Sequence, residues 1–237
     1  MRRPFSSFVL AAIFAVGCAP MASAQQSVDF YMGGFVPTSM SSRGVDDVLF
    51  QNSSFLSTLN STNGIDLDQF NNFTFGGDYL VALGHYFEAG GGIGFYQKTV
   101  TTTYTNFVNA NGTEIFQDLQ LRIVPFSATF RVLPFGHNNG VEPYVGAGVG
   151  VFAWRYSETG QFVDANSNIF NGNFVGSGAT VGPMVLGGVR FPVGPMSFGG
   201  EIRWQSASAD LPPDQTFAGS KINLGGFNYL FNMGFRF

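Results

Sequence analysis

Residues 227–237 alternate regularly between two kinds of side chain, and this alternation constrains the fold more than any other feature of the sequence. A period of two residues is that of a β-strand, whose side chains point to opposite faces in turn. One face is apolar throughout: Phe227, Tyr229, Phe231, Met233, Phe235 and Phe237. The other carries Asn228, Asn232, Gly234 and Arg236. The apolar core of a water-soluble protein could not accommodate such a polar face. We therefore expect the apolar face to contact lipid and the polar face to line a lumen.

The composition is that of a membrane protein, yet no segment suits a membrane helix. Charged residues make up 11% of the chain, while it contains 32 Gly and 28 Phe. Soluble domains carry about 25% charged residues. Beyond the amino-terminal segment no run of 18 apolar residues occurs, which excludes spanning helices. A closed β-barrel is the other structure that satisfies every backbone hydrogen bond in lipid.

Alternation elsewhere predicts eight strands, and therefore an all-β, antiparallel, up-and-down transmembrane barrel. Val145, Ala147, Val149 and Val151, for example, alternate with Tyr144 and small glycines. Leu119, Leu121 and Ile123 have the opposite parity to Phe126, so we expect a β-bulge near Pro125. The strands are expected near 27–36, 72–84, 88–103, 119–132, 144–151, 185–191, 197–205 and 227–237.

Connections of alternating length orient the predicted barrel. Short turns are expected at 85–87, 134–140 and 192–195. Long polar segments are expected at 37–71, 104–115, 155–179 and 206–221. Outer-membrane barrels have short periplasmic turns and long external loops, which places both termini in the periplasm. The first long segment also contains many apolar residues, such as Leu49 and Leu56, and should form a folded cap.

Residues 1–24 have the pattern of a cleaved signal peptide, which leaves 25–237 as the barrel. Arg2 and Arg3 precede a short apolar run and the small-residue pattern Ala22-Ser23-Ala24. Lipid modification of Cys18 is the alternative, on a loose lipobox pattern. Without Arg2 and Arg3, 9 Lys and Arg remain against 15 Asp and Glu, a formal net charge of −6. Such a balance argues against a nucleic-acid partner.

The carboxy-terminal alternation also resembles the β-signal by which outer-membrane proteins are recognised for assembly, with Tyr229, Phe231, Met233, Phe235 and Phe237 as its residues. Together with the segments VEPYVGAGVGVF and GPMVLGGVRFPV, it makes the mature chain resemble the OmpX/OmpA/OmpW-like outer membrane β-barrel superfamily. The resemblance implies a Gram-negative outer membrane location and contact with the assembly machinery. It implies little about activity.

Neither catalysis nor a metal or cofactor site is expected. Lipid A-modifying barrels place a His-x-Ser motif at the external rim, whereas His85 and His137 fall in predicted periplasmic turns and begin no such motif. The segment Asp164-x-Asn166-x-Asn168 opens like a calcium loop, but Ile169 and Val175 stand where Gly and Glu are required. We therefore expect a non-enzymatic protein without cofactor.

Charged residues on the inward parity predict a lumenal charge network. Its members are Asp78, Glu88, Arg131, Glu142, Arg190, Glu201, Arg203 and Arg236. Eight strands enclose a space that side chains can fill, and unpaired charges there are costly. An ion-paired plug is the preferred interpretation, especially since Tyr96, Tyr144 and Phe152 share the inward parity. A gated pathway through the same residues is the alternative.

Two functional classes follow. The first is a plugged barrel, able to stand as a monomer, that displays acidic external loops for envelope integrity, adhesion or partner contact. The acids at issue are Asp46, Asp47, Asp66, Asp68, Glu114, Glu158, Asp164, Asp210 and Asp214, against Arg43, Arg155 and Lys221. Divalent cations would connect such acids to lipopolysaccharide phosphates. The second class is a small-solute or apolar-molecule channel of OmpW type.

Overall fold

The computed structural model describes residues 25–59, 61, 64–137 and 140–237. The expected signal peptide, residues 1–24, and Cys18 within it lie outside the described residues.

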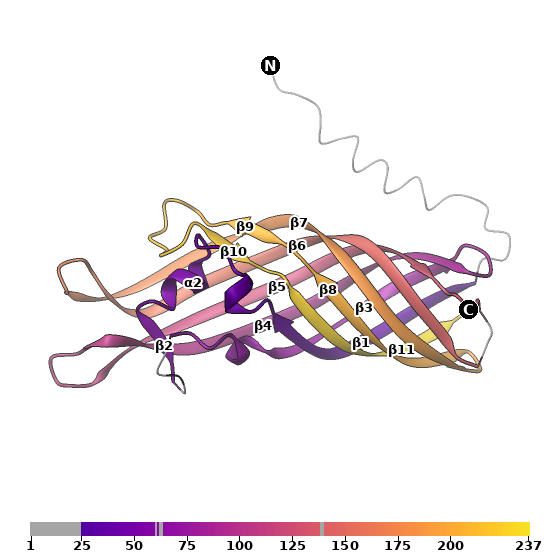
Figure 1. Cartoon of the computed structure of the whole chain (residues 1–237), viewed down its shortest axis with the longest axis horizontal. Coiled ribbons are helices and arrows are strands. Elements are labelled where there is room, and N and C mark those ends of the chain that lie inside the picture. Colours follow the sequence, from indigo (N-terminus) through magenta and orange to yellow (C-terminus); the bar gives the residue numbers. More distant parts are fainter. Residues whose placement is uncertain (1–24, 60, 62–63, 138–139) are drawn as a thin grey trace, which may run out of the picture.

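Eight antiparallel strands close into a barrel, which confirms the predicted fold class (Figure 1). Each strand pairs with its neighbours around the ring, and pairing of β1 with β11 joins the two ends of the chain. The barrel strands are β1 (Gln26–Pro37), β3 (Asn72–Ala82), β4 (Phe87–Val108), β5 (Glu114–Val132), β6 (Glu142–Val163), β7 (Ile169–Val193), β8 (Met196–Gln205) and β11 (Gly226–Arg236).

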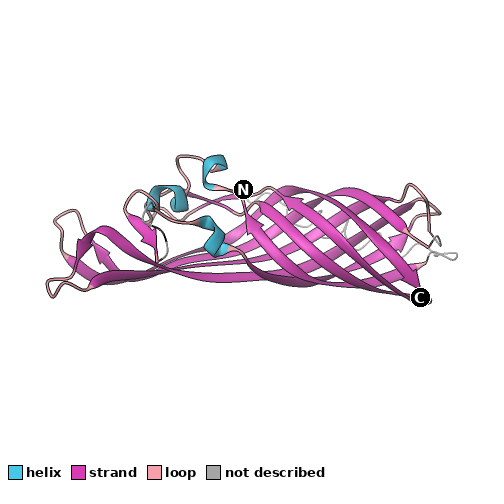
Figure 2. Cartoon of the chain, turned by 60° about the horizontal axis from the view of Figure 1, so that its bottom comes forward, coloured by secondary structure: helices cyan, strands magenta, loops and turns pink. Residues whose placement is uncertain are grey.

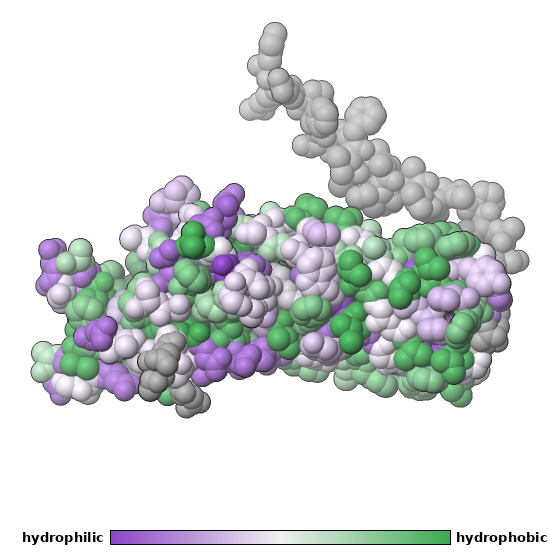
Figure 3. All heavy atoms as spheres, viewed as in Figure 1, coloured by the Kyte–Doolittle hydropathy of each residue, from purple (hydrophilic) through white to green (hydrophobic). Residues whose placement is uncertain are grey.

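The barrel exterior is an apolar surface. On β11 the aromatic residues Phe227, Tyr229 and Phe231 are exposed, whereas Asn228 and Asn232 are buried. Hydrophobic residues gather around the half of the barrel that carries the C terminus, and hydrophilic residues are more frequent toward the other end (Figure 3). Barrels with an apolar outer band and a polar interior are those of bacterial outer membranes, because lipid replaces water outside. The chain is therefore a transmembrane β-barrel of the outer-membrane type.

Strands β4 to β7 continue well past the others at the end opposite the C terminus (Figure 2). Strands β4 to β7 pair with one another as far as residues 108, 114, 163 and 169. Two segments expected to be long loops, 104–115 and 155–179, are thus largely strand, which corrects that expectation. The alternation of apolar residues weakens there because both faces lie beyond the membrane, although the backbone pairing continues.

The first and last long loops fold over the external end. The first contains α2 (Val48–Asn52) and β2 (Leu56–Thr58), and the last contains β9 (Ser208–Asp210) paired with β10 (Lys221–Asn223). Their apolar side chains pack into the barrel against Tyr96, Phe152, Trp154 and other inward residues of β4 to β6. The first loop therefore forms the folded cap that its composition predicted. Among the described residues, no helix has the length and apolar character needed to cross a membrane.

The bulge expected near Pro125 is absent from β5. The pairing of β5 with β6 keeps one register from Gln117 to Val132. Leu119, Leu121 and Ile123 instead point inward and are buried in the apolar core beneath the cap. The prediction was wrong because it assumed one polar lumen along the whole barrel, whereas the interior is charged in the periplasmic half and apolar in the external half.

Candidate functional site: the charged barrel interior

Each of the eight barrel strands contributes at least one charged side chain, buried or partly buried, to the periplasmic half of the lumen. Seven of the eight residues anticipated from inward parity are buried there, the eighth, Arg236, is partly buried, and the structure adds the buried Asp29. The contributions run Asp29 on β1, Asp78 on β3, Glu88 on β4, Arg131 on β5, Glu142 on β6, Arg190 on β7, Glu201 and Arg203 on β8, and Arg236 on β11. We refer to these nine residues as the lumenal charge network.

The layer nearer the centre of the barrel consists of two arginines and two acids. Asp78 Oδ2 accepts from Arg131 Nη2 at 2.9 Å and from Arg203 Nη2 at 2.7 Å. Glu201 lies on the other side of the same arginines, with Oε1 2.7 Å from Arg203 and Oε2 3.3 Å from Arg131 Nη2. The two acids and two bases alternate, so each charge is surrounded by opposite charge.

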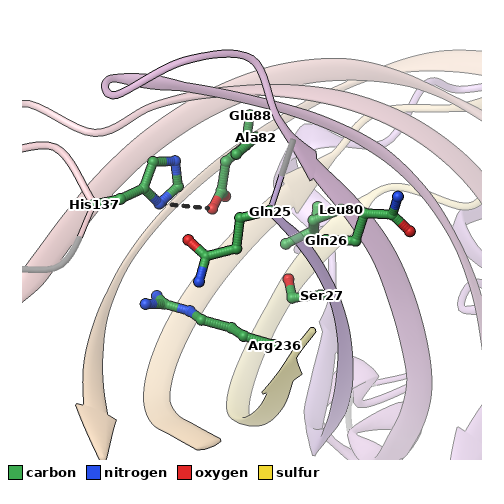
Figure 4. A pocket seen from close by; sticks show the side chains of 8 residues that line it. All are labelled: Gln25, Gln26, Ser27, Leu80, Ala82, Glu88, His137 and Arg236. Carbon is green, nitrogen blue, oxygen red and sulfur yellow. Dashed lines mark ion pairs between the residues drawn. The ribbon is translucent and has the colours of Figure 1, made fainter. Parts of the chain in front are cut away.

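The layer nearer the periplasm is built around Arg190. Its Nη2 donates to Glu88 Oε1 at 2.6 Å, and its Nε lies 3.9 Å from Glu142 Oε2. Glu142 in turn accepts from both Nη groups of Arg236. His137 reaches in from the turn after β5, with Nδ1 3.6 Å from Glu88 Oε1 (Figure 4). The second layer therefore connects β4, β6, β7 and β11.

Asp29 joins the two layers and was missed at the sequence level. Its Oδ2 lies 3.7 Å from Arg190 Nη1 and 3.9 Å from Arg131 Nη1, yet neither carboxylate oxygen has a hydrogen bond among the described residues. The alternation of Asp29, Tyr31 and Phe35 with the apolar Phe30 and Met32 was the signal that could have found it.

Aromatic side chains separate the arginines. The guanidinium carbons of Arg131 and Arg190 lie 5.0 and 5.1 Å from the centroid of the Tyr144 ring, within the range of cation–π attraction. The Tyr144 hydroxyl donates to Glu201 at 3.0 Å. Gly188 leaves space for this ring, because a Cβ there would lie 2.5 Å from the hydroxyl. Tyr96, Tyr144 and Phe152 are buried, as their parity predicted.

Two cavities among the described residues inside the barrel are each the size of a water molecule. A cavity of about 10 Å³ lies among inward residues that include Thr74, Tyr96 and Asn228. A second of about 10 Å³ at the periplasmic end is lined by Glu88, His137, Arg236 and neighbours (Figure 4). Each has room for about one water molecule.

The aromatic residues of the expected assembly signal lie on the outer face. Tyr229, Phe231, Met233 and Phe235 alternate with inward residues of β11, and Phe237 follows the strand with its side chain 70% exposed.

Two acids expected on the solvated external surface are buried instead. Asp47 caps α2 by accepting from Leu49 and Phe50 N–H, and it also pairs with Arg43 at 3.0 Å. Glu158 accepts from Asn52 at 2.7 Å and from the Tyr156 hydroxyl. Both contribute to cap folding. The contact of Glu158 with Asn52 could not be predicted from sequence, because these residues are 106 positions apart.

The histidines and the calcium-like segment lie where the sequence suggested. His85 and His137 are in the turns at the C-terminal end of the barrel, and His137 N–H donates to the His85 carbonyl. Asp164 Oδ1 accepts from the backbone N–H groups of Asn166 and Asn168, so its turn closes on itself. Among the described residues no group of three metal-ligating side chains converges.

Comparison with known proteins finds distant structural similarity only. No protein-family model and no curated protein sequence matches the chain. Neisserial surface protein A is 11% identical, with a TM-score of 0.44, covering 91% of this chain and 99% of that one. The outer membrane protein AlkL, solved in lipid bilayers, is 12% identical, with a TM-score of 0.42, covering 93% of each chain. The attachment invasion locus protein Ail of Yersinia pestis, in complex with sucrose octasulfate, is 12% identical, with a TM-score of 0.41, covering 91% of this chain and 99% of that one. At these values the comparisons carry no argument about function.

Proposed function

We propose that this outer-membrane barrel is a plugged, non-catalytic scaffold that presents a folded external cap and an acidic extension for envelope integrity, adhesion or partner contact. The observation that carries the proposal is the lumenal charge network, to which every barrel strand contributes. Moving it aside would separate several buried ion pairs at once, and breaking one buried pair costs about 3–5 kcal/mol.

A second barrier supports the same proposal. Above the network the lumen is filled by the apolar core, in which Leu121, Ile123 and Phe152 are at most 2% exposed. An ion that crosses the barrel would have to pass both the lumenal charge network and the apolar core above it. The two cavities found among the described lumenal residues are water-sized, which is too small for a hydrated solute.

A gated channel is the alternative, and one observation favours it. Within the part of the chain that the structure describes, Asp29, Arg131 and Arg190 retain buried polar atoms without hydrogen-bond partners. Buried polar groups of this kind usually bind ordered water. A hydrated seam between the two layers is where a pathway would open.

Electrical recording in a planar bilayer distinguishes the two functions. The plugged wild type should give no steady conductance. Glu201→Ala removes the acid that faces both Arg131 and Arg203, so this variant should unfold more easily and show intermittent openings. A wild type with stable unitary conductance, shifted toward anions by the same substitution, would establish the channel instead.

External acids of the cap and extension provide the surface for contact. Exposed members include Asp66, Asp68, Glu114, Asp210 and Asp214. Divalent cations can connect such carboxylates to lipopolysaccharide phosphates, since both are anionic. Chelation should therefore weaken lipopolysaccharide retention if the acidic surface has this role, and retention unaffected by chelation would exclude it.

A further inference from the structure

A row of exposed polar side chains crosses four strands just above the apolar band. Gln97, Arg122, Arg155 and Ser177 are direct cross-strand neighbours on β4 to β7, and all four are exposed. The outward row directly below consists of Phe95, Val124, Ala153 and Ala179. Below the polar row, the remaining parts of β4 and β5 are Phe87–Phe95 and Val124–Val132. Each is roughly as long as the 9–11 residues with which a strand crosses a hydrocarbon core. The polar row therefore lies at headgroup level on the external side.

Arg122 and Arg155 lie directly opposite each other in this row. Like charges at directly opposed positions of an antiparallel pair repel and destabilise the sheet. Neither guanidinium has a hydrogen bond or an ion pair with any described residue, and the outward neighbours Val124 and Ala153 carry no charge. The pair is thus a local concentration of positive charge.

Two other basic residues of the external half, by contrast, are paired with acids. Arg43 pairs with Asp47, and Lys221 lies 3.1 Å from Asp46. Arg155, expected in a loop, is instead fixed on β6 beside Arg122, which sequence reasoning did not single out. Arg122 and Arg155 are thus two adjacent arginines without acidic partners among the described residues, on an external surface that is otherwise acidic. Such a pair is suited to bind an anionic ligand.

We propose that Arg122 and Arg155 together bind the phosphate group of an anionic lipid headgroup in the external leaflet. Two guanidinium forks can each present paired N–H donors to phosphate oxygens, which fixes an oxyanion between them. Gln97, exposed beside Arg122, adds a further donor at the same height. Direct contact of this kind needs no bridging cation. The inference rests on the proposed external orientation of this end but not on whether the lumen is plugged.

Native mass spectrometry of the purified barrel in neutral detergent tests the site. The probes are diphosphorylated lipid A, its dephosphorylated form, and inorganic phosphate. Wild type should bind the diphosphorylated lipid and discriminate against the dephosphorylated one. Each basic residue near a membrane surface contributes about 1 kcal/mol, so Arg122→Gln or Arg155→Gln should weaken binding roughly fivefold and the double variant about 25-fold. Lys98→Gln is the matched control. Lys98 is next to Gln97 on β4, but it lies on the inward face of the strand, like its buried cross-strand partner Leu121.

Unchanged lipid A affinity in the double variant would overturn the proposal. Arginine-dependent binding of inorganic phosphate as tight as that of the lipid would overturn the lipid assignment. Misfolding does not confuse the result, since removing two exposed, mutually repelling charges should leave the melting temperature unchanged or raised. A barrel that conducts in the bilayer experiment would contradict the plug but leave this binding measurement intact.

Discussion

Arg203 on β8 and Asp78 on β3 meet across the barrel interior, with Nη2 and Oδ2 2.7 Å apart. The same carboxylate oxygen also accepts from Arg131 on β5. Three strands that are not all neighbours in the ring are thus held by one carboxylate group, so the network ties the barrel together across its lumen as well as around its wall.

Asp78→Asn should destabilise the barrel by about 3–5 kcal/mol, because the buried Arg131 and Arg203 lose the negatively charged carboxylate that both of them contact. Urea-induced unfolding in lipid vesicles, followed by tryptophan fluorescence, measures the change. Asp118→Asn is the control, since Asp118 is exposed on the outer face of β5 and surface changes usually stay within about 0.5 kcal/mol. Equal unfolding of the two variants would show that the network is not stabilising.

Asp47→Ala should open the external cap while the barrel stays folded. Asp47 Oδ2 accepts from the Asn223 N–H at 2.7 Å and so connects the first loop to the last. Its loss leaves Arg43 buried without its acid, at a cost of about 3 kcal/mol. Limited proteolysis should then cut within 38–71 and 206–225. Asp46→Ala removes only the exposed pair with Lys221, which contributes little to stability because solvent screens it. Equal cleavage of both variants would contradict the role of Asp47.

Glu158 should make cap stability depend on pH. Burial raises the pKa of this carboxyl, against the smaller lowering by its hydrogen bonds from Asn52 and Tyr156. A folded pKa above the unfolded one means that the stabilisation is complete below the ordinary pKa of 4.5 and is lost as the pH rises through the folded value. Hydrogen exchange of cap amides should therefore speed up with pH beyond its intrinsic increase.

Glu158→Gln should abolish that dependence and protect the cap at neutral pH, because the amide oxygen still accepts from Asn52 and Tyr156. Glu114→Gln, at an exposed hairpin position, is the matched control. Identical exchange profiles for wild type and Glu158→Gln would show that Glu158 does not titrate in this range.

Phe237→Ala should lower the yield of outer-membrane protein if the terminal aromatic residues are the assembly signal. The backbone hydrogen bonds between Phe237 and Gln26 are kept in this variant, and the ring that is lost is exposed. Cell fractionation and heat-shifted gel mobility measure the yield. Phe237→Trp should assemble normally, and normal assembly of Phe237→Ala would exclude the signal.

The eight strands and their two faces were predictable from sequence because the period of two is a local property of the chain. Residues 227–237 illustrate this, since each side chain's face follows from its neighbours alone. The same rule placed Asp78, Glu201 and Arg203 inward. It did not say which acid meets which arginine, because Asp78 and Arg203 are 125 residues apart.

Parity alone also failed where the surroundings of a face change along the barrel. Leu119 and Phe126 have opposite parity on one continuous strand, and only the cap's apolar residues explain why Leu119 points inward without a bulge. Arg155 looked like a loop residue because apolar alternation ends where the membrane ends, yet backbone pairing continues. Alternation along the sequence determined which residues share a face; the ring closure and the folding of two distant loops over it decided what each face contacts.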